Sequence, residues 1–187
     1  MKKVIIILLA VIGFAANSAQ AQDNLIKVNI FSPVVRTASV FYEKPIAEDK
    51  SVQLGFFYTG FSIEDVKLRG YGITPEFRKY LSASKQAPEG FYVAPFLRYQ
   101  SLNMTLDEDS EMEDMNGKAT LNAFGGGLLI GHQWIVGSRF VVDSFLGPSY
   151  SASNVKVTAG DQEEFDDSIG TFSGFGLRAG LTIGLRF

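Results

Sequence analysis

The stretch GFGLRAGLTIGLRF, residues 174–187, alternates strictly between two kinds of side chain. Apolar residues occupy every odd position from Phe175 to Phe187, and glycine, threonine or arginine occupies every even position from Gly174 to Arg186. Because successive side chains of a β-strand point to opposite faces, this period of two predicts a strand with one apolar face and one small or polar face.

The same alternation recurs upstream and predicts eight strands in all. Clear apolar faces lie within residues 52–58, 71–77, 91–99 and 140–150, with Phe57 as an exception in the first of them. Two weaker strands come first, around residues 26–30 and 38–43, and the glycine-rich segment 120–134 is a strand without a clear face assignment. Pro75 and Pro95 fall inside strands, where a proline cannot donate to the ladder.

The composition of the two faces indicates which solvent each one meets. The polar face consists mainly of Gly, Ser and Thr with a few charges, too small a set to coat a water-soluble protein. The apolar face is larger and more aromatic, as expected where lipid lies outside and aromatic girdles mark the rims. The pattern therefore predicts an all-β, eight-stranded antiparallel up-and-down transmembrane β-barrel. A secreted, soluble, lipocalin-like barrel carrying a small apolar ligand is the alternative, with its apolar face turned inward.

The first 21 residues have the features of a secretory signal peptide. Lys2 and Lys3 precede an uncharged stretch of 13 residues, 4–16, and Ala19 and Ala21 provide small residues for cleavage. Such a stretch falls short of the roughly 20 residues of a spanning helix. We expect residues 1–21 to be a cleaved signal peptide and residues 22–187 to form the barrel domain.

Connection lengths provide an independent check on the topology. With both ends of the barrel in the periplasm, the expected outer loops are 32–36, 60–69, 103–117 and 151–170. The expected periplasmic turns are 45–50, 81–90 and 135–138. Three of the four outer loops are at least as long as the longest turn, in keeping with short periplasmic turns and long extracellular loops.

The closing strand also resembles the C-terminal assembly signal of outer-membrane proteins, with Leu185 and Phe187 at its apolar positions. The mature chain is similar to small eight-stranded outer-membrane barrels of the OmpA-transmembrane and OmpX type, and to barrel proteins of Bacteroidetes-like genomes. This resemblance implies the outer membrane of a Gram-negative bacterium, with its lipid and lipopolysaccharide as neighbours. It also implies the barrel-assembly machinery as a partner during biogenesis, and it transfers no catalytic residue because such barrels share no catalytic motif.

Composition excludes several other classes of function. The chain has no cysteine and one histidine, so thiolate sites and multi-histidine metal sites are excluded. A net charge of −3 gives no electrostatic reason to expect nucleic acid. We expect no cofactor, no dedicated metal ion and no enzymatic activity.

Charged residues on the polar face are the candidate luminal site. An eight-stranded barrel leaves an interior just wide enough for side chains, and unpaired charge there is costly. We therefore expect a salt-bridged plug that fixes the barrel's register, with Glu76 pairing with Arg98 and Asp143 with Arg178. An ion or proton relay is the functional alternative. The inward charges are Glu43, Glu76, Arg78, Arg98, Asp143, Arg178 and Arg186.

Eleven of the 20 acidic residues lie in two of the expected outer loops. Oxygen-only clusters suit Ca²⁺ or Mg²⁺, but the spacing lacks the glycine of an EF-hand. Asp107, Asp109 and Glu111 are weak candidates for association with divalent cations. Solvated loops that share cations with anionic lipid, or a surface that binds an unknown extracellular partner, are the other interpretations.

The single histidine raises the possibility of an outer-membrane lipid-modifying enzyme. His132 would need a serine and an acid on the lipid-facing side, where parity offers Ser144 but no carboxylate. We instead expect His132 and Trp134 in the interfacial aromatic girdle. The function expected from the sequence is thus a non-catalytic structural or surface-interaction role.

Overall fold

The computed structural model describes residues 24–63, 66–82, 85–106, 118–159 and 173–187. These residues form a closed barrel in which each strand pairs antiparallel with the next and β8 pairs with β1. This confirms the eight-stranded antiparallel up-and-down β-barrel. The strands are β1 Leu25–Asn29, β2 Thr37–Ala47, β3 Lys50–Ile63, β4 Val66–Tyr80, β5 Gly90–Leu106, β6 Lys118–Val136, β7 Phe140–Ala159 and β8 Gly174–Arg186.

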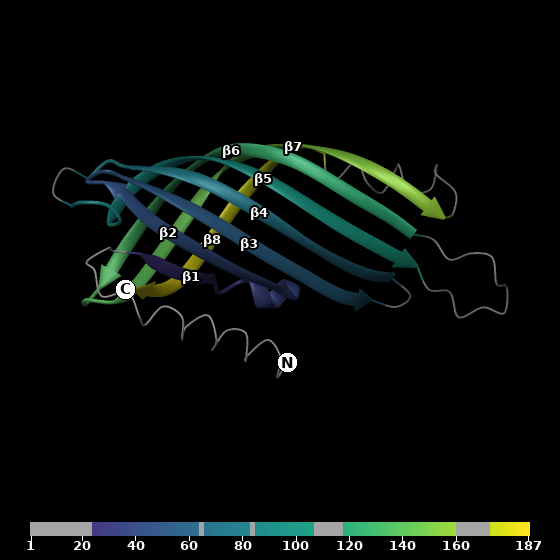
Figure 1. The fold of residues 1–187 in the computed structure, drawn as a ribbon, viewed down its shortest axis with the longest axis horizontal. Helices are drawn as coiled ribbons and strands as arrows, with labels where there is room; N and C mark the ends of the chain where they lie inside the picture. The colour runs from purple at the N-terminus through teal and green to yellow at the C-terminus, as the bar shows by residue number, and fades with distance from the viewer. Residues whose placement is uncertain (1–23, 64–65, 83–84, 107–117, 160–172) are drawn as a thin grey trace.

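The barrel is elongated, and its strands run obliquely to the long axis (Figure 1). We call one end the terminal end, because Asn24 and Phe187 meet there beside the β2–β3, β4–β5 and β6–β7 turns. The opposite end, the loop end, holds the β3–β4, β5–β6 and β7–β8 connections and the short 3₁₀-helix η2 Ser32–Val35. In the described part of the chain no helix is long and apolar enough to cross a membrane.

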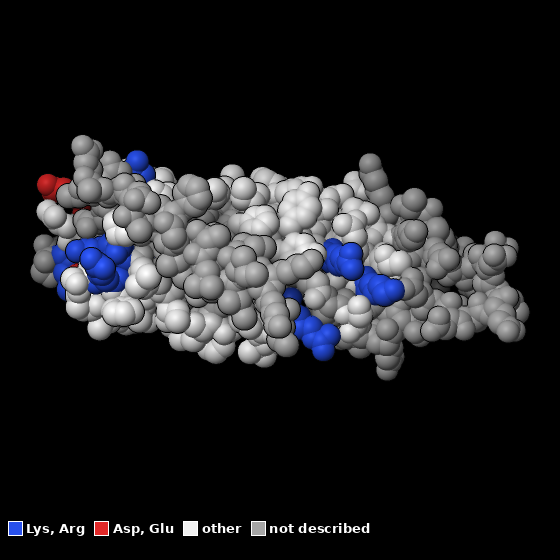
Figure 2. Space-filling view, turned by 60° about the horizontal axis from the view of Figure 1, so that its bottom comes forward, with Lys and Arg blue, Asp and Glu red and all other residues white. Residues whose placement is uncertain are grey.

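Large apolar side chains lie on the outside of the barrel. Along β8, Phe175 and Leu177 are 91% and 72% exposed, whereas Thr182 on the other face is buried. β3 repeats the pattern, with Leu54 exposed and Gln53 buried. In the view of Figure 2, charged side chains lie toward the two ends, and the described surface between them is uncharged. This distribution is the reverse of a soluble ligand-carrying barrel, so the lipocalin-like alternative is not favoured.

Inward glycines provide room for inward aromatic rings. A Cβ atom at Gly72 would lie 2.2 Å from the Phe57 ring, and one at Gly131 would lie 2.4 Å from the Tyr92 ring. Any side chain larger than glycine at residue 72 or 131 would therefore clash with the neighbouring ring. The alternation of glycine with apolar residues thus reflects two demands on one strand, lipid contact outside and ring packing inside.

Several strands extend further toward the loop end than the sequence pattern indicated. β3 and β4 stay paired up to Ile63 and Val66, so most of the expected loop 60–69 is a hairpin. β7 continues to Ala159 and takes up residues 151–159 of the expected loop 151–170. Backbone pairing satisfies N–H and C=O groups whatever the side chains are, so a ladder can outlast the side-chain alternation.

Pro75 and Pro95 are accommodated on one seam of the barrel. This seam is the one between β4 and β5. Toward the strands on the far sides both prolines keep their register partners: Pro75 faces Leu54 of β3, and Pro95 faces Leu128 of β6. Between β4 and β5 the pairing skips the proline positions without shifting register. The flanking pairs are Ile73–Tyr99, Glu76–Phe96 and Lys79–Val93. The two missing donors thus interrupt the same ladder and leave the neighbouring ladders intact.

Candidate functional site in the barrel lumen

Lys27 of β1 lies at the centre of a buried polar cluster near the terminal end. Its Nζ donates to Glu43 Oε2 at 2.6 Å, to Gln133 Oε1 at 2.6 Å and to Asp143 Oδ2 at 2.9 Å. The lysine and both carboxylates have side chains that are 0% exposed. All three donor positions of the ammonium are therefore used inside the barrel.

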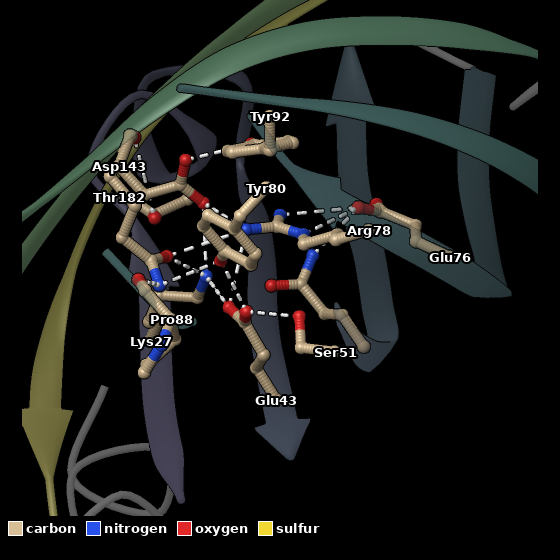
Figure 3. A network of polar contacts seen from close by, with 12 residues as sticks. Lys27, Glu43, Ser51, Glu76, Arg78, Tyr80, Pro88, Tyr92, Asp143 and Thr182 are labelled. Carbon is tan, nitrogen blue, oxygen red and sulfur yellow. Dashed lines mark hydrogen bonds and ion pairs between the residues drawn. The ribbon is translucent and has the colours of Figure 1, made fainter. Parts of the chain in front are cut away.

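Arg78 of β4 is the second cation of this cluster (Figure 3). Its Nη1 lies 3.2 Å from Glu43 Oε2 and 2.9 Å from Asp143 Oδ2, while its Nη2 lies 3.2 Å from Glu76 Oε2. The guanidinium carbon also sits 4.3 Å from the centroid of the Tyr92 ring. One guanidinium thereby joins carboxylates from three different strands.

Neutral side chains complete the hydrogen bonding of the two carboxylates. Glu43 accepts from the Ser51 hydroxyl at 2.5 Å and from the Tyr80 hydroxyl at 2.6 Å. Asp143 accepts from the Tyr92 hydroxyl at 2.8 Å. Buried charges of this kind are tolerated only when partners replace the lost water. We call this set the terminal network: Lys27, Glu43, Ser51, Arg78, Tyr80, Tyr92, Gln133 and Asp143.

The β4–β5 turn adds a backbone contact to the terminal network. Gln133 Nε2 donates to the Pro88 carbonyl at 2.6 Å and to the Tyr80 hydroxyl at 3.2 Å. Ala87, beside it, is buried, and its N–H donates to the Glu48 carbonyl of the β2–β3 turn. The turn is therefore tied to the luminal side chains at the terminal end.

A second group of charges lies further toward the loop end. Arg178 Nη2 donates to Glu76 Oε1 at 2.7 Å, and its guanidinium carbon lies 4.6 Å from the Phe96 ring centroid and 5.0 Å from that of Phe145. Arg98 stacks over Phe57 at 4.9 Å. Within the described residues, Arg98 forms no ion pair.

The two arginines line one pocket in the loop half of the lumen, with a volume of about 80 Å³. We call this space with its lining the arginine pocket. Its wall combines the two cations with small and polar groups and the buried Phe96 ring. The lining residues are Phe96, Arg98, Gln100, Ala123, Gly125, Gly126, Ser149, Tyr150, Ser151 and Arg178.

The structure brings together Glu76, Arg78, Asp143 and Arg178 from the predicted plug, but not in the predicted pairs. Glu76 pairs with Arg78 and Arg178 rather than Arg98, and Asp143 pairs with Lys27 and Arg78 rather than Arg178. In so narrow a lumen, side chains reach strands on the opposite wall, so adjacency in the sheet does not decide the pairs.

Arg186 is half-buried at the terminal end, where it is the register partner of Leu25. Sequence reasoning missed Lys27, Gln133 and the two tyrosines as network members. For Lys27 a signal existed, because it alternates with Ile26 and Val28.

His132 and Trp134 lie on the outer face near the terminal end. The His132 ring contacts Phe91 and Trp134, with centroids 4.4 Å and 4.2 Å apart. Ser144 is the register partner of His132 on β7. Within the described ranges no carboxylate contacts this histidine, so it lacks the acid that a hydrolytic triad requires.

The remaining predicted sites divide between the described and the undescribed parts of the chain. Asp107, Asp109 and Glu111 lie outside the described residues, as does the whole signal segment 1–21. Elsewhere, the described residues contain no group of three or more acidic or histidine side chains that could hold a metal ion. Leu185 pairs with Ile26 of β1, and Phe187 exchanges backbone hydrogen bonds with Asn24 at 2.9 and 3.1 Å.

Three solved structures are similar to the chain, and the first of them supports the fold. A major outer membrane protein from Thermus thermophilus is 13% identical with a TM-score of 0.57, and the match covers 90% of this chain and 100% of that one. The N-terminal barrel domain of Pseudomonas aeruginosa OprF is 14% identical, with coverages of 90% and 100% and a TM-score of 0.44. Acinetobacter baumannii CarO is 11% identical, with coverages of 88% and 96% and a TM-score of 0.42.

With its apolar exterior and polar lumen, the protein has the fold of the small eight-stranded outer-membrane barrels. At the level of sequence families, residues 4–166 match a family model described as protein of unknown function (DUF3575), and the chain belongs to that family. No curated protein matches the chain.

Proposed function

We propose that the protein is an integral outer-membrane barrel with a closed lumen, and that its role is structural or in surface interaction rather than catalytic. The observation that carries this proposal is the inverted distribution of side chains. Phe175 and Leu177 are exposed on the outside, while Glu43 and Arg78 are 0% exposed inside. In a barrel surrounded by water the large apolar side chains would instead fill the interior and the polar face would meet the solvent.

The same proposal includes the route to the membrane. A cleaved signal peptide, residues 1–21, exports the chain, and the strand ending in Leu185 and Phe187 engages the barrel-assembly machinery. Lipid and lipopolysaccharide then surround the outward-facing apolar side chains of the strands. The acidic segments 107–117 and 160–172, which connect β5 to β6 and β7 to β8 in the chain, share divalent cations with anionic lipid or contact an extracellular partner.

Membrane insertion is tested by substitutions on the outer face. Ile73, which pairs with Phe56 in the middle of the barrel, is exposed. Ile73→Arg should destabilise the folded barrel in lipid vesicles by about 2–4 kcal/mol, since arginine at the bilayer midplane costs that much. Val34→Arg, in the exposed 3₁₀-helix at the loop end, is the matched control and should cost about 0–1 kcal/mol. Equal costs at the two positions would contradict a lipid-facing belt.

Orientation is tested with single cysteines, which is straightforward because the chain contains none. A cysteine at Ser110, in the acidic segment 107–117, should react with a membrane-impermeant maleimide on intact cells. A cysteine at Ser138, in the exposed β6–β7 turn, should react only after the outer membrane is permeabilised. The reverse pattern would overturn the proposed orientation, and recovery of the protein in detergent-free buffer would overturn the membrane location.

Closure of the lumen makes a separate prediction. The purified barrel should give no large stable conductance in planar bilayers, because the terminal network and the β4–β5 turn occupy the terminal end. A steady open-channel current from the wild-type protein would contradict the closed-lumen part of the proposal while leaving membrane insertion intact.

A further inference from the structure

The luminal charges do not balance. The terminal network and the arginine pocket, together with Glu76, contain four cations and three carboxylates. The cations are Lys27, Arg78, Arg98 and Arg178, and the carboxylates are Glu43, Glu76 and Asp143. Each carboxylate already contacts at least two cations, so no carboxylate of these clusters is left for Arg98.

Two guanidinium nitrogens of the arginine pocket lack hydrogen-bond partners in the described structure. Arg98 Nε and Arg178 Nη1 are both buried and bond to nothing there. The aromatic rings beside these arginines lie under the guanidinium carbons, and they offer no oxygen acceptor to the N–H donors. Stacking on Phe57, Phe96 and Phe145 therefore leaves the N–H groups unsatisfied, at a cost that native structures generally avoid.

The arginine pocket has space and further polar groups next to these donors. Its volume is about 80 Å³, and roughly 10–15 Å³ of such space is enough for one water molecule. Gln100 and Ser149 contribute an amide and a hydroxyl, while Gly125, on the inward face opposite Arg98, adds no side chain to the wall. A tetrahedral or planar anion of four or five heavy atoms fits in this space, where the protein provides no fourth carboxylate.

We propose that the arginine pocket binds a small oxyanion, with Arg98 as its main ligand and Arg178 and Gln100 as further donors. An anion supplies the negative charge that the lumen lacks, and its oxygens accept hydrogen bonds from the N–H groups that the protein leaves unpaired. Guanidinium groups suit this task because their fork of donors matches phosphate and carboxylate geometry. The inference concerns the folded barrel itself and does not depend on its location in the cell.

The test uses full-length mature protein folded in an uncharged detergent and titrated calorimetrically with sodium phosphate. Parallel titrations with sodium acetate and sodium chloride distinguish a phosphate-type anion, a carboxylate and a simple ionic-strength effect. We expect saturable binding of one anion per barrel. Arg98→Met should weaken that binding about tenfold or more, because it removes charge-assisted hydrogen bonds.

Arg139→Met is the matched control, because Arg139 lies exposed in the β6–β7 turn and its loss changes net charge equally. It should leave the dissociation constant unchanged. A second variant, Ala123→Leu, tests the space rather than the charge. Ala123 is buried in the pocket wall, so a leucine side chain there should fill the pocket and abolish anion binding. The mobility of unheated protein on gels verifies that each variant is folded.

Three results would overturn the proposal. They are the absence of saturable binding for every oxyanion, equal affinities of the Arg98→Met and Arg139→Met proteins, and unchanged binding by a folded Ala123→Leu protein. Because all of these are measured on detergent-folded barrel, none of them bears on membrane location or on closure of the terminal end.

Discussion

The two halves of the lumen use the same residue types in different ways. In the terminal half, Lys27 and Arg78 are surrounded by Glu43, Gln133 and Asp143, and every donor of the lysine is used. In the loop half, Arg98 faces a ring, small residues and open space. One half is a completed network, and the other has donors without acceptors.

The difference shows that inward charge alone does not define a plug. A fully paired network rigidifies the interior, whereas an incompletely paired one carries an energetic penalty that a ligand can relieve. Substitutions of equivalent chemistry in the two halves should therefore have unequal effects on stability.

The largest effect is expected for Arg78→Met. This cation touches Glu43, Glu76 and Asp143, so its removal leaves buried carboxylates short of positive charge. Breaking a buried ion pair by removing one partner costs about 3–5 kcal/mol. Unfolding of the detergent-folded barrel in urea, which adds no ions, should reveal a loss of that size.

A double variant checks the cause of that loss. Adding Asp143→Asn to Arg78→Met should recover part of the stability, because the second change removes one uncompensated charge. The coupling energy from the four proteins isolates the Arg78–Asp143 term. Strictly additive losses would mean that the network is hydrated or rearranged, and would remove the contrast between the two halves.

A smaller loss is expected for Tyr92→Phe. The change deletes the hydroxyl that donates to Asp143 at 2.8 Å while keeping the ring that lies over Arg78. A hydrogen bond to a charged group contributes about 1.5–3 kcal/mol. Tyr99→Phe is a matched control, since its hydroxyl bonds the Asn122 side chain at an exposed site, and its loss should be smaller. Equal losses would argue against a special role for the terminal network.

The overall fold was predictable from the sequence because lipid and lumen impose opposite demands on alternate residues. That rule acts locally along each strand, so the pattern of residues 174–187 sufficed for the faces of β8 and, repeated, for the number of strands. Strand ends were less accessible. β3 and β4 pair through Ser62 and Lys67, where the apolar–polar alternation is out of phase with that of residues 52–58 and 71–77, because the backbone ladder does not depend on which side chains alternate.

The luminal partners were less predictable, because they depend on closure of the barrel. Lys27 of β1 meets Gln133 of β6, and Glu76 of β4 meets Arg178 of β8, across the interior rather than along a seam. Parity identifies which residues point inward, but the depth of each strand decides which of them meet. Parity can be read from one strand's sequence, whereas the depth of the strand in the closed barrel cannot.

The smallest effect on stability, and the only one predicted here that is neutral or stabilising, is expected for Arg98→Met. In buffer poor in oxyanions this variant should be at least as stable as the wild type, because replacing an uncompensated buried charge with an apolar side chain is often neutral or stabilising. The lost contact with Phe57 offsets about 2 kcal/mol of that gain, the magnitude of a desolvated cation–π interaction. In saturating phosphate the order should reverse, since a ligand that binds only the folded wild type adds to its stability. Urea unfolding of both proteins with and without phosphate measures the crossover. A loss of several kcal/mol in both buffers would place Arg98 in the same structural class as Arg78 and erase the distinction between the two halves.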